Sequence, residues 1–234
     1  EAMGAEPSAV VIGLAFPRDL DRRWVSDFQE GVVEECARAG VSLVGGDLSS
    51  SPHIALGVTA LGNLSGRPAI TRAGARIGDQ VAVCGRLGCS AGGLLVLQRG
   101  FGSPKDLVLE QQCPTVPYGQ GKAAAEAGAT AMIDVSDGLL QDLGHICELS
   151  GVGIDVRTAA LKIHDSLARL AAATGKDPLG FVLAGGEDHA LVATFPAQVE
   201  LPQGWLRIGT VTSGAEVIVD GMPWAGSVGW DHFA

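Results

Sequence analysis

The sequence has few positive charges and lacks the marks of several common protein classes. No apolar run approaches the roughly 18 residues of a membrane-spanning helix, and no signal peptide is visible. Lys and Arg number 16 against 26 Asp and Glu, a net charge of −10 that argues against nucleic acid and anionic membranes as partners. If the protein binds a polyphosphate, metal ions must neutralise much of the charge.

The two commonest nucleotide-binding signatures are also missing. The glycine-rich segment 85–88 fits neither the phosphate-loop spacing Gly-x4-Gly-Lys-Ser/Thr nor the dinucleotide spacing Gly-x-Gly-x-x-Gly. The five cysteines are odd in number and scattered, with no Cys-x-x-Cys pair. This pattern indicates reduced, mostly buried thiols in a cytoplasmic protein.

The composition is that of a folded, turn-rich globular protein. Of 234 residues, 47% are hydrophobic and only 18% charged, so disorder is not expected. Glycine occurs 34 times, about twice the usual share, without a period, which points to many tight turns. The polar turn at 63–66 predicts a domain boundary, which divides the chain into 1–66 and 67–234.

Hydrophobic periodicity predicts the elements of the first part. A strand is expected at 9–14 and a helix over 21–40, capped by an aspartate and closed by a glycine. Further strands are expected at 41–44 and 54–61. We expect these two strands to flank an acidic loop, 45–51, as a hairpin-like pair.

The stretch around Asp134 carries the strongest chemical signal. The apolar run 129–133 leads into Asp134, Ser136 and Asp137, and a helix is expected over 139–149. Two carboxylates this close repel each other unless a cation lies between them. With no Lys or Arg nearby, a divalent metal is the simplest such cation. The alternative is that the serine or the second aspartate only caps the helix.

Two other turns combine glycine with acids. Asp47 follows two glycines, which permit close approach of a ligand to the backbone, although hairpin turns use the same residues. Glu187, Asp188 and His189 precede a strand expected at 190–195 and form a conceivable metal site. Because adjacent residues on a strand point in alternate directions, at most two of these three would be ligands.

Two single residues outside these turns are candidate ligand contacts. Arg72 lies in a basic segment, 72–79, of an otherwise acid-rich chain; it either reaches a phosphate or is a solvated surface arginine. Trp230 belongs to an aromatic tail, 229–233. This tail either docks into the core or places its indole over a ligand pocket.

These motifs together carry a family resemblance over essentially the whole chain. The motifs resemble those of thiamine-monophosphate kinases, a family in the superfamily of aminoimidazole ribonucleotide synthetase. They occur in this order: Leu-Val-Gly-Gly-Asp at 43–47, Thr-Arg-Ala-Gly-Ala at 71–75, Ile-Asp-Val-Ser-Asp-Gly-Leu at 133–139, Gly-Gly-Glu-Asp at 185–188 and Gly-Trp-Asp-His-Phe at 229–233.

The resemblance implies a fold and a reaction. The expected fold is α/β (α+β), a cytoplasmic homodimer of two-domain subunits whose mixed sheets carry helices on one face. Residues 1–66 would form the ATP-binding domain that pairs in the dimer, with its beginning missing from the chain, and 67–234 the C-terminal α/β domain. The implied reaction is transfer of the γ-phosphoryl group of Mg-ATP to thiamine monophosphate, which gives thiamine diphosphate.

The resemblance also assigns roles to residues. No general base is assigned, because the acceptor phosphate oxygen is already ionised near neutral pH. The implied ATP contacts are Gly46, Asp47, Arg72 and Ser136; the contacts to the thiamine end are Glu187 and Trp230; and the ligands of several Mg²⁺ ions are Asp47, Asp134 and Asp137.

The chain departs from the family pattern in three places. The family's Gly-Gly-Asp-Thr-Thr-Arg-Gly is Gly-Gly-Asp-Leu-Ser-Ser-Ser over 45–51, and its Tyr-Glu after Gly-Gly-Glu-Asp is His189-Ala190. The family's N-terminal Gly-Asp-Asp-Ala segment, with further metal ligands, is not in this chain, and its true deletion would make the protein inactive.

Two alternative functions remain open. One is another ATP-using enzyme of the superfamily, such as selenophosphate synthetase or a hydrogenase-maturation factor. Selenophosphate synthetase would require a reactive N-terminal cysteine and the maturation factor a C-terminal cysteine. Residues 232–234 contain no cysteine. The other is a non-catalytic nucleotide-binding paralogue.

Overall fold

The computed structural model of the protein describes residues 1–230 and contains two compact units. Unit 1 comprises residue 1 and residues 5–68; unit 2 comprises residues 2–4 and the chain from residue 69 onward. The expected mixed α/β class, with two sheets, is confirmed. The functional roles expected for 1–66 and 67–234 stay predictions.

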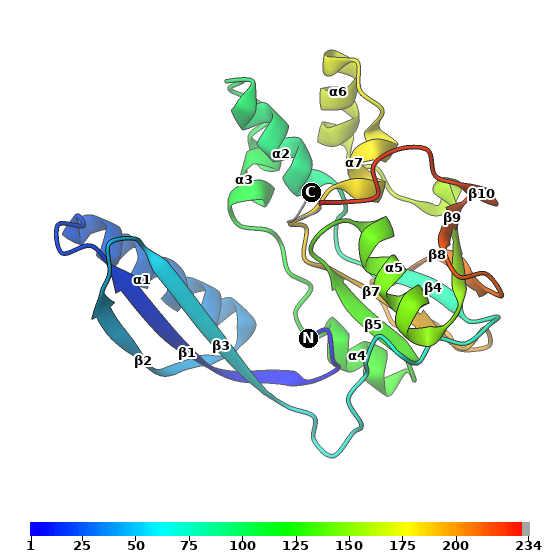
Figure 1. Ribbon diagram of the computed structural model, residues 1–234, viewed down its shortest axis with the longest axis horizontal. Helices are drawn as coiled ribbons and strands as arrows, with labels where there is room; N and C mark the ends of the chain where they lie inside the picture. Colours follow the sequence, from blue (N-terminus) through cyan, green and yellow to red (C-terminus); the bar gives the residue numbers. More distant parts are fainter. Residues whose placement is uncertain (231–234) are drawn as a thin grey trace. The chain divides into compact units, whose positions relative to one another are not determined.

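Unit 1 is a three-stranded sheet with one long helix along it (Figure 1). Its strand order is β2-β1-β3, with β2 parallel and β3 antiparallel to β1. The hairpin-like pair expected from 41–44 and 54–61 is therefore wrong, because β1 lies between the two strands. The bounds are β1 Glu6–Phe16, α1 Arg22–Ala39, β2 Ser42–Ser50 and β3 Ala55–Asn63.

Local signals define α1 as the sequence predicted. The Asp21 carboxylate accepts a hydrogen bond from the Arg23 N–H at 2.9 Å, which satisfies one of the unpaired donors of the first turn. Gly40 ends the helix in the left-handed conformation at φ 67°, where glycine costs least. Trp24 and Phe28, one turn apart, stack with ring centroids 5.5 Å apart.

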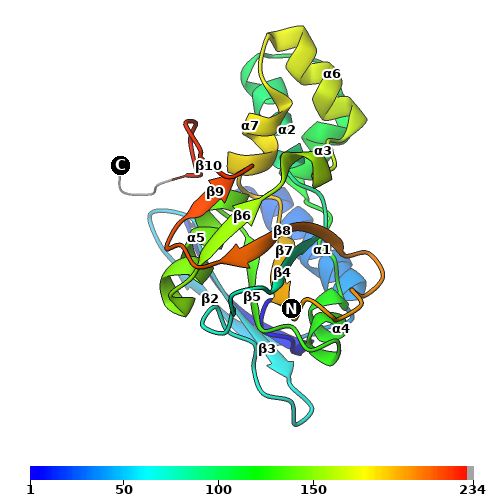
Figure 2. The same cartoon turned by 90° about the vertical axis from the view of Figure 1, so that its right-hand side faces the viewer.

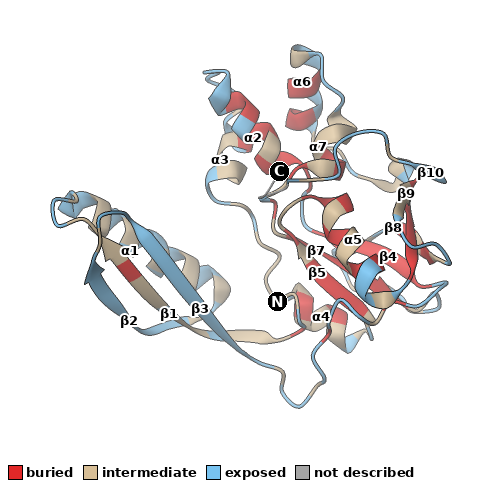
Figure 3. Cartoon of the chain, viewed as in Figure 1, coloured by how far each residue is buried: buried red, intermediate tan, exposed pale blue. Residues whose placement is uncertain are grey.

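Two strands of unit 1 are exposed along their whole length. Every residue of β2 and β3 is exposed, and both strands are pale blue in Figure 3. Large apolar side chains are among them, including Leu48 at 70% and Val58 at 61% exposure. Apolar side chains in such a continuous sheet surface are typical of an interaction site.

Unit 2 contains a seven-stranded sheet in the order β10-β9-β6-β8-β4-β7-β5 (Figure 2). All neighbouring strands are antiparallel except β6 and β9, which are parallel. The bounds are β4 Gln80–Cys84, β5 Ala131–Val135, β6 Gly153–Val156, β7 Ala190–Phe195, β8 Leu206–Thr212, β9 Val217–Val219 and β10 Met222–Pro223.

Alternating side chains on this sheet build two apolar clusters. Val81 and Val83 of β4 belong to the larger cluster, while Ala82 and Cys84 belong to a smaller one on the opposite face, where Ala124 of α4 also packs. The helices are α2 Cys89–Gln98, α3 Lys105–Gln112, α4 Gln120–Glu126, α5 Leu139–Ser150, α6 Asp165–Thr174 and α7 Pro178–Ala184, with a 3-10 turn η1 at Thr158–Ala160.

The cysteines are free thiols, as the scattered spacing predicted. Cys84, Cys89 and Cys147 are buried, Cys36 is half-buried and Cys113 is exposed. Burial raises the pKa of the Cys89 thiol to about 12, so this thiol stays protonated and behaves as an apolar group. Of the helices in residues 1–230, none has the length and apolar content to cross a membrane.

Candidate functional site

A carboxylate inside α5 organises the turn that follows β5. One oxygen of Asp142, Oδ2, accepts hydrogen bonds from the backbone N–H groups of Ser136 at 3.0 Å, Asp137 at 3.1 Å and Gly138 at 3.1 Å. Burial raises the pKa of Asp142, against the opposing effect of these bonds. The turn is therefore drawn onto the start of α5, and Ser136 and Asp137 are held in one backbone conformation.

Two further segments pack tightly against this turn. The Glu187 N–H donates to the Ser136 carbonyl at 2.8 Å, and the Trp230 N–H donates to the Asp137 carbonyl at 2.9 Å. A Cβ at Gly186 would lie 2.6 Å from the Ser136 carbonyl oxygen, and one at Gly229 would lie 2.7 Å from that of Asp137. The glycines are thus required by close backbone approach between segments distant in sequence.

These segments enclose a cavity of about 450 Å³ that contains four of the predicted site residues. The polar groups on its wall include three serine hydroxyls, two carboxylates and a glutamine amide, and the start of α2 supplies apolar area. The Trp230 side chain is 64% exposed, so its indole is accessible to a ligand. The predicted residues on the wall are Ser136, Asp137, Glu187 and Trp230; the others are Ser90, Ala91, Leu94, Gln111, Ala184, Gly185, Gly186, Ser227 and Gly229.

The segment 187–189 has a strained backbone. Glu187 and His189 adopt positive φ angles of 64° and 51°, which cost about 1–3 kcal/mol each in residues with a Cβ. Asp188 between them is buried and accepts hydrogen bonds from the N–H groups of Gly88 and Ser90 at the start of α2. Burial raises the pKa of Asp188 to about 7. Asp188 therefore has a structural role, which leaves Glu187 and His189 to face outward.

His189 connects two of the predicted site carboxylates. Its Nδ1 lies 3.9 Å from Oδ2 of Asp134, and its Nε2 lies 3.7 Å from Oε2 of Glu187. The polar contact with His189 lowers the pKa of Asp134, and the charge on Arg72 adds a smaller effect in the same direction. The contact with Asp134 raises the pKa of His189. The imidazole of His189 therefore favours the ionised form of the Asp134 carboxylate.

Arg72 lies with Asp134 at a second cavity, of about 460 Å³, and not on the wall of the first. Its loop is tied down by Ser150, whose hydroxyl donates to the Arg72 carbonyl at 2.7 Å and accepts from the N–H groups of Gly74 and Ala75 at 3.2 Å. Of the predicted site residues in unit 2, four therefore line the first cavity, and Arg72 and Asp134 line the second.

Gly46 and Asp47 lie within strand β2 and not in the turn that the sequence suggested. A Cβ at Gly46 would lie 2.0 Å from the Ile12 carbonyl oxygen, so close approach of β1 requires glycine here. Asp47 is exposed, and its carboxylate accepts a hydrogen bond from the Ser49 hydroxyl. The ATP and metal roles of these two residues stay predictions.

The predicted metal ligands have suitable donor chemistry. Asp134 offers a carboxylate whose lowered pKa keeps it ionised, and carboxylate oxygens are the donors that Mg²⁺ prefers. Within residues 1–230, no group of three or more His, Cys, Asp or Glu side chains is arranged to hold a metal. The assignment of Asp47, Asp134 and Asp137 as ligands therefore stays a prediction.

Sequence reasoning missed Asp142 as part of the site. The signal for Asp142 was available, because an acid in the first turn of a helix that follows a polar turn can accept from the turn's N–H groups. His189 was considered a metal ligand, and the structure places it in contact with Asp134 and Glu187. Asp231, His232 and Phe233 of the C-terminal motif lie outside the described residues.

Family models match most of the chain. Residues 1–64 match the N-terminal domain of AIR synthase related protein, and residues 76–221 match its C-terminal domain. The thiamine-monophosphate kinase of Mycobacterium tuberculosis (strain ATCC 25618 / H37Rv) is 48% identical over 235 residues, which cover 100% of this chain and 70% of that protein.

Solved structures agree with these matches. The crystal structure of thiamine monophosphate kinase from Aquifex aeolicus superposes with a TM-score of 0.88 at 33% identity, covering 95% of this chain and 76% of that one. A structure of AaThiL complexed with AMPPCP and TMP also gives a TM-score of 0.88, at 32% identity, and covers 99% of this chain and 75% of that one.

Proposed function

The chain belongs to the thiamine-monophosphate kinase family, and on that premise we propose that it transfers the γ-phosphoryl group of ATP to thiamine monophosphate. The product is thiamine diphosphate. The observation that carries the proposal is the cavity that brings together Ser136, Asp137, Glu187 and Trp230 from three separate segments. A relative solved with AMPPCP and TMP supports the same pair of substrates.

Glu187 and Trp230 bind the thiamine end of the acceptor in this proposal. The exposed indole of Trp230 stacks on the cationic thiazolium ring, an interaction of about 1–2 kcal/mol when water is excluded. The Glu187 carboxylate, on the wall of the same cavity, pairs with the pyrimidine or with the positive ring. Both contacts favour a ligand with a flat, cationic ring, which the thiazolium of thiamine monophosphate provides.

ATP is bound by Gly46, Asp47, Arg72 and Ser136 in this proposal. The Arg72 guanidinium is exposed and suits a phosphate oxygen. The Ser136 side chain lies on the wall of the cavity that contains Asp137. The strongly acidic chain cannot neutralise a triphosphate with its few cations, so metal ions must contribute.

Asp47, Asp134 and Asp137 are the proposed Mg²⁺ ligands. When bound, Mg²⁺ neutralises charge on the phosphate oxygens. The carboxylates of the chain hold and position the metal–nucleotide complex, and Asp142 keeps Asp137 in place through the turn. No side chain needs to remove a proton, because the attacking phosphate oxygen is ionised, so positioning for in-line transfer is the main contribution of the protein.

The exposed sheet of unit 1 supports a homodimer. Apolar side chains on β2 and β3, such as Leu48 and Val58, are more than half exposed, and a second copy of the chain would cover them. Light scattering on the purified protein tests this: a dimer is expected, and Leu48→Glu should give a monomer. A monomeric wild-type protein would contradict the dimer. We also place the protein in the cytoplasm, in keeping with its free cysteines.

A coupled assay of the full-length protein with Mg-ATP and thiamine monophosphate tests the function. Formation of thiamine diphosphate is expected, with ADP in equal amount. ATP binding without product would refute the kinase activity and favour the non-catalytic nucleotide-binding paralogue. ADP formation that depends on a different acceptor would favour another ATP-using synthetase of the superfamily.

A further inference from the structure

Unit 2 contains a third cavity, which the proposed reaction does not use. Its volume is about 550 Å³, and it shares no lining residue with the cavity of Asp137 and Trp230. It lies among the loop between β4 and α2, the segment that leads into α6, and the start of β8. Its polar and charged walls include Arg86, Lys162, His164, Asp165, Ser166 and Arg169.

The charge on this cavity wall is opposite to that of the whole chain. Among the lining residues, three permanent cations, Arg86, Lys162 and Arg169, outnumber one carboxylate, Asp165, although Arg86 is paired with a carboxylate outside the lining. Over the whole sequence, by contrast, 26 acidic residues outnumber 16 Lys and Arg. A local reversal of this kind in a concave site attracts anions, because the walls exclude part of the screening solvent.

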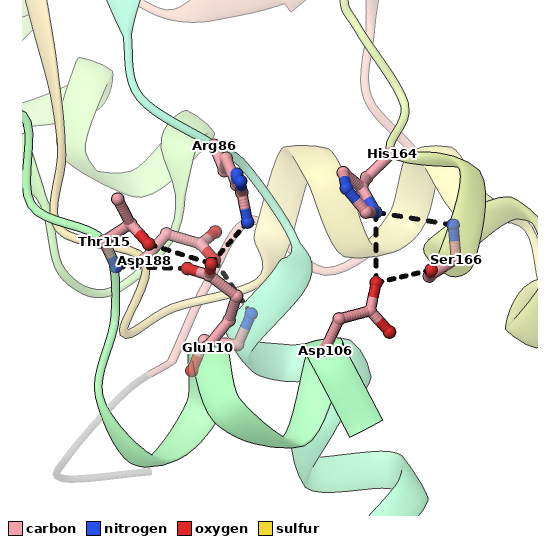
Figure 4. A network of polar contacts seen from close by, with 8 residues as sticks. Arg86, Asp106, Glu110, Thr115, His164, Ser166 and Asp188 are labelled. Atoms are coloured by element: carbon pink, nitrogen blue, oxygen red, sulfur yellow. Dashed lines mark hydrogen bonds and ion pairs between the residues drawn. The ribbon is translucent and has the colours of Figure 1, made fainter. Parts of the chain in front are cut away.

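The cations on the wall differ in how they are held. Figure 4 shows the pair of Arg86 with Glu110 and the contacts among Asp106, His164 and Ser166. Arg86 pairs with Glu110 of α3, and the Arg169 guanidinium donates to the Ser166 hydroxyl at 2.9 Å. The Ser166 hydroxyl in turn donates to Asp106, whose carboxylate lies 3.9 Å from His164.

Lys162 is the cation that has no counter-charge. Among residues 1–230 it forms no hydrogen bond or ion pair, so its ammonium group is fully available to a ligand. Arg169 is oriented by a hydroxyl and not by a carboxylate, and its remaining N–H groups can still bind an anion. Lys162 and Arg169 are therefore the groups that would hold the charged end of a ligand.

An apolar wall completes the cavity. Its aliphatic side chains come from β4, from the segments that precede α2 and α6, and from β8. A ligand that fits must therefore combine a charged end with an apolar body. These side chains are Val83, Leu87, Leu161, Ile163 and Leu206.

We propose that this cavity binds a phosphorylated small molecule with an apolar or aromatic body, at a site separate from that of the proposed kinase substrates. The phosphate lies against Lys162 and Arg169, with Arg86 at the rim, and the body lies against the aliphatic wall. A dianionic phosphate matches several cations better than a single carboxylate does.

Titration of the 234-residue chain with phenyl phosphate, without ATP or metal, tests the proposal by calorimetry. Saturable binding is expected, and the double variant Lys162→Ala/Arg169→Ala should weaken it at least about tenfold, as loss of charge-assisted hydrogen bonds does. Lys162→Arg/Arg169→Lys, which keeps both charges but changes the donor geometry, should lose less affinity than the double alanine variant does. Trp230→Ala should leave the affinity unchanged, which separates this site from the proposed kinase site.

Lys176→Ala is the matched control, because Lys176 is also an exposed lysine but does not line the cavity. It should bind phenyl phosphate as the wild type does. An equal loss of affinity in this control would show a general charge effect and overturn the proposal. Absence of saturable binding, or unchanged affinity in the double variant, would also overturn it. If the double variant does not fold, the single variant Lys162→Gln is titrated in its place. Lys162 forms no hydrogen bond or ion pair within residues 1–230, so its replacement should leave the fold intact.

Discussion

Replacement of Asp142 tests how the turn at 136–138 is built. In Asp142→Ala the three N–H groups of Ser136, Asp137 and Gly138 lose their shared acceptor. A buried donor without a partner costs about 1–3 kcal/mol. Gly138 is buried and takes this cost in full, whereas the half-buried Ser136 and Asp137 recover part of it from water. We therefore expect a loss of about 3 kcal/mol in the free energy of unfolding.

Asp142→Asn is the matched control, since an amide oxygen can still accept all three bonds. Burial raises the pKa of Asp142, so removal of its charge also removes a desolvation cost. We expect a loss of only about 1 kcal/mol in this variant. Urea denaturation gives both values, and thiamine monophosphate turnover should fall at least about tenfold in the alanine variant only. Equal destabilisation of the two variants would refute the role of the shared acceptor.

Three other changes test separate parts of the account. Trp230→Ala should raise the KM for thiamine monophosphate with little effect on the KM for ATP; a rise confined to ATP would contradict the stacking role. Gly186→Ala should lower the melting temperature and turnover, because its Cβ would lie 2.6 Å from the Ser136 carbonyl oxygen, and Gly180→Ala, with open space around it, serves as control. Burial raises the pKa of Asp188 from 3.8 to about 7, so the folded state holds the proton more tightly than the unfolded state does. The free energy of unfolding should therefore fall by on the order of 4 kcal/mol as the pH rises from about 4 to about 7. In Asp188→Asn, denaturation curves should lose most of this pH dependence; an unchanged pH profile would show that another group is responsible.

Elements with local signals were predictable from the sequence. The helix over 21–40 was predicted because Asp21 and Gly40 cap it through contacts within one turn. The strand expected at 190–195 was confirmed as β7, since it is a short apolar run between polar or glycine-rich segments.

Features set by distant contacts were not predictable in this way. The glycines at 45 and 46 indicated a turn, yet Gly46 lies in a strand because the backbone of β1 approaches it. The placement of β1 between β2 and β3 depends on pairing across many residues, and no local pattern encodes it. Helix α7 was not predicted from the sequence; it has only seven residues.

The candidate site shows the same division. Ser136, Asp137, Glu187 and Trp230 were each singled out from the sequence, and the structure brings them to one cavity. The contact between His189 and Asp134 could not be foreseen, because it depends on the pairing of β5 with β7, in which Val135 lies opposite Ala190. Sequence patterns supplied the chemistry of the site, and tertiary pairing determined which groups meet.

The most direct test of the account is transfer of the label from [γ-³²P]ATP, in the presence of Mg²⁺, to thiamine monophosphate by the wild-type protein and by Asp137→Asn. The account predicts labelled thiamine diphosphate with the wild type and none with the variant. The variant should keep the wild-type melting temperature, because the substitution leaves unchanged the Asp137 N–H, which donates to the Asp142 carboxylate, and the Asp137 carbonyl, which accepts from the Trp230 N–H. Labelled product from both proteins at equal rates would contradict the assignment of this cavity as the site of phosphoryl transfer.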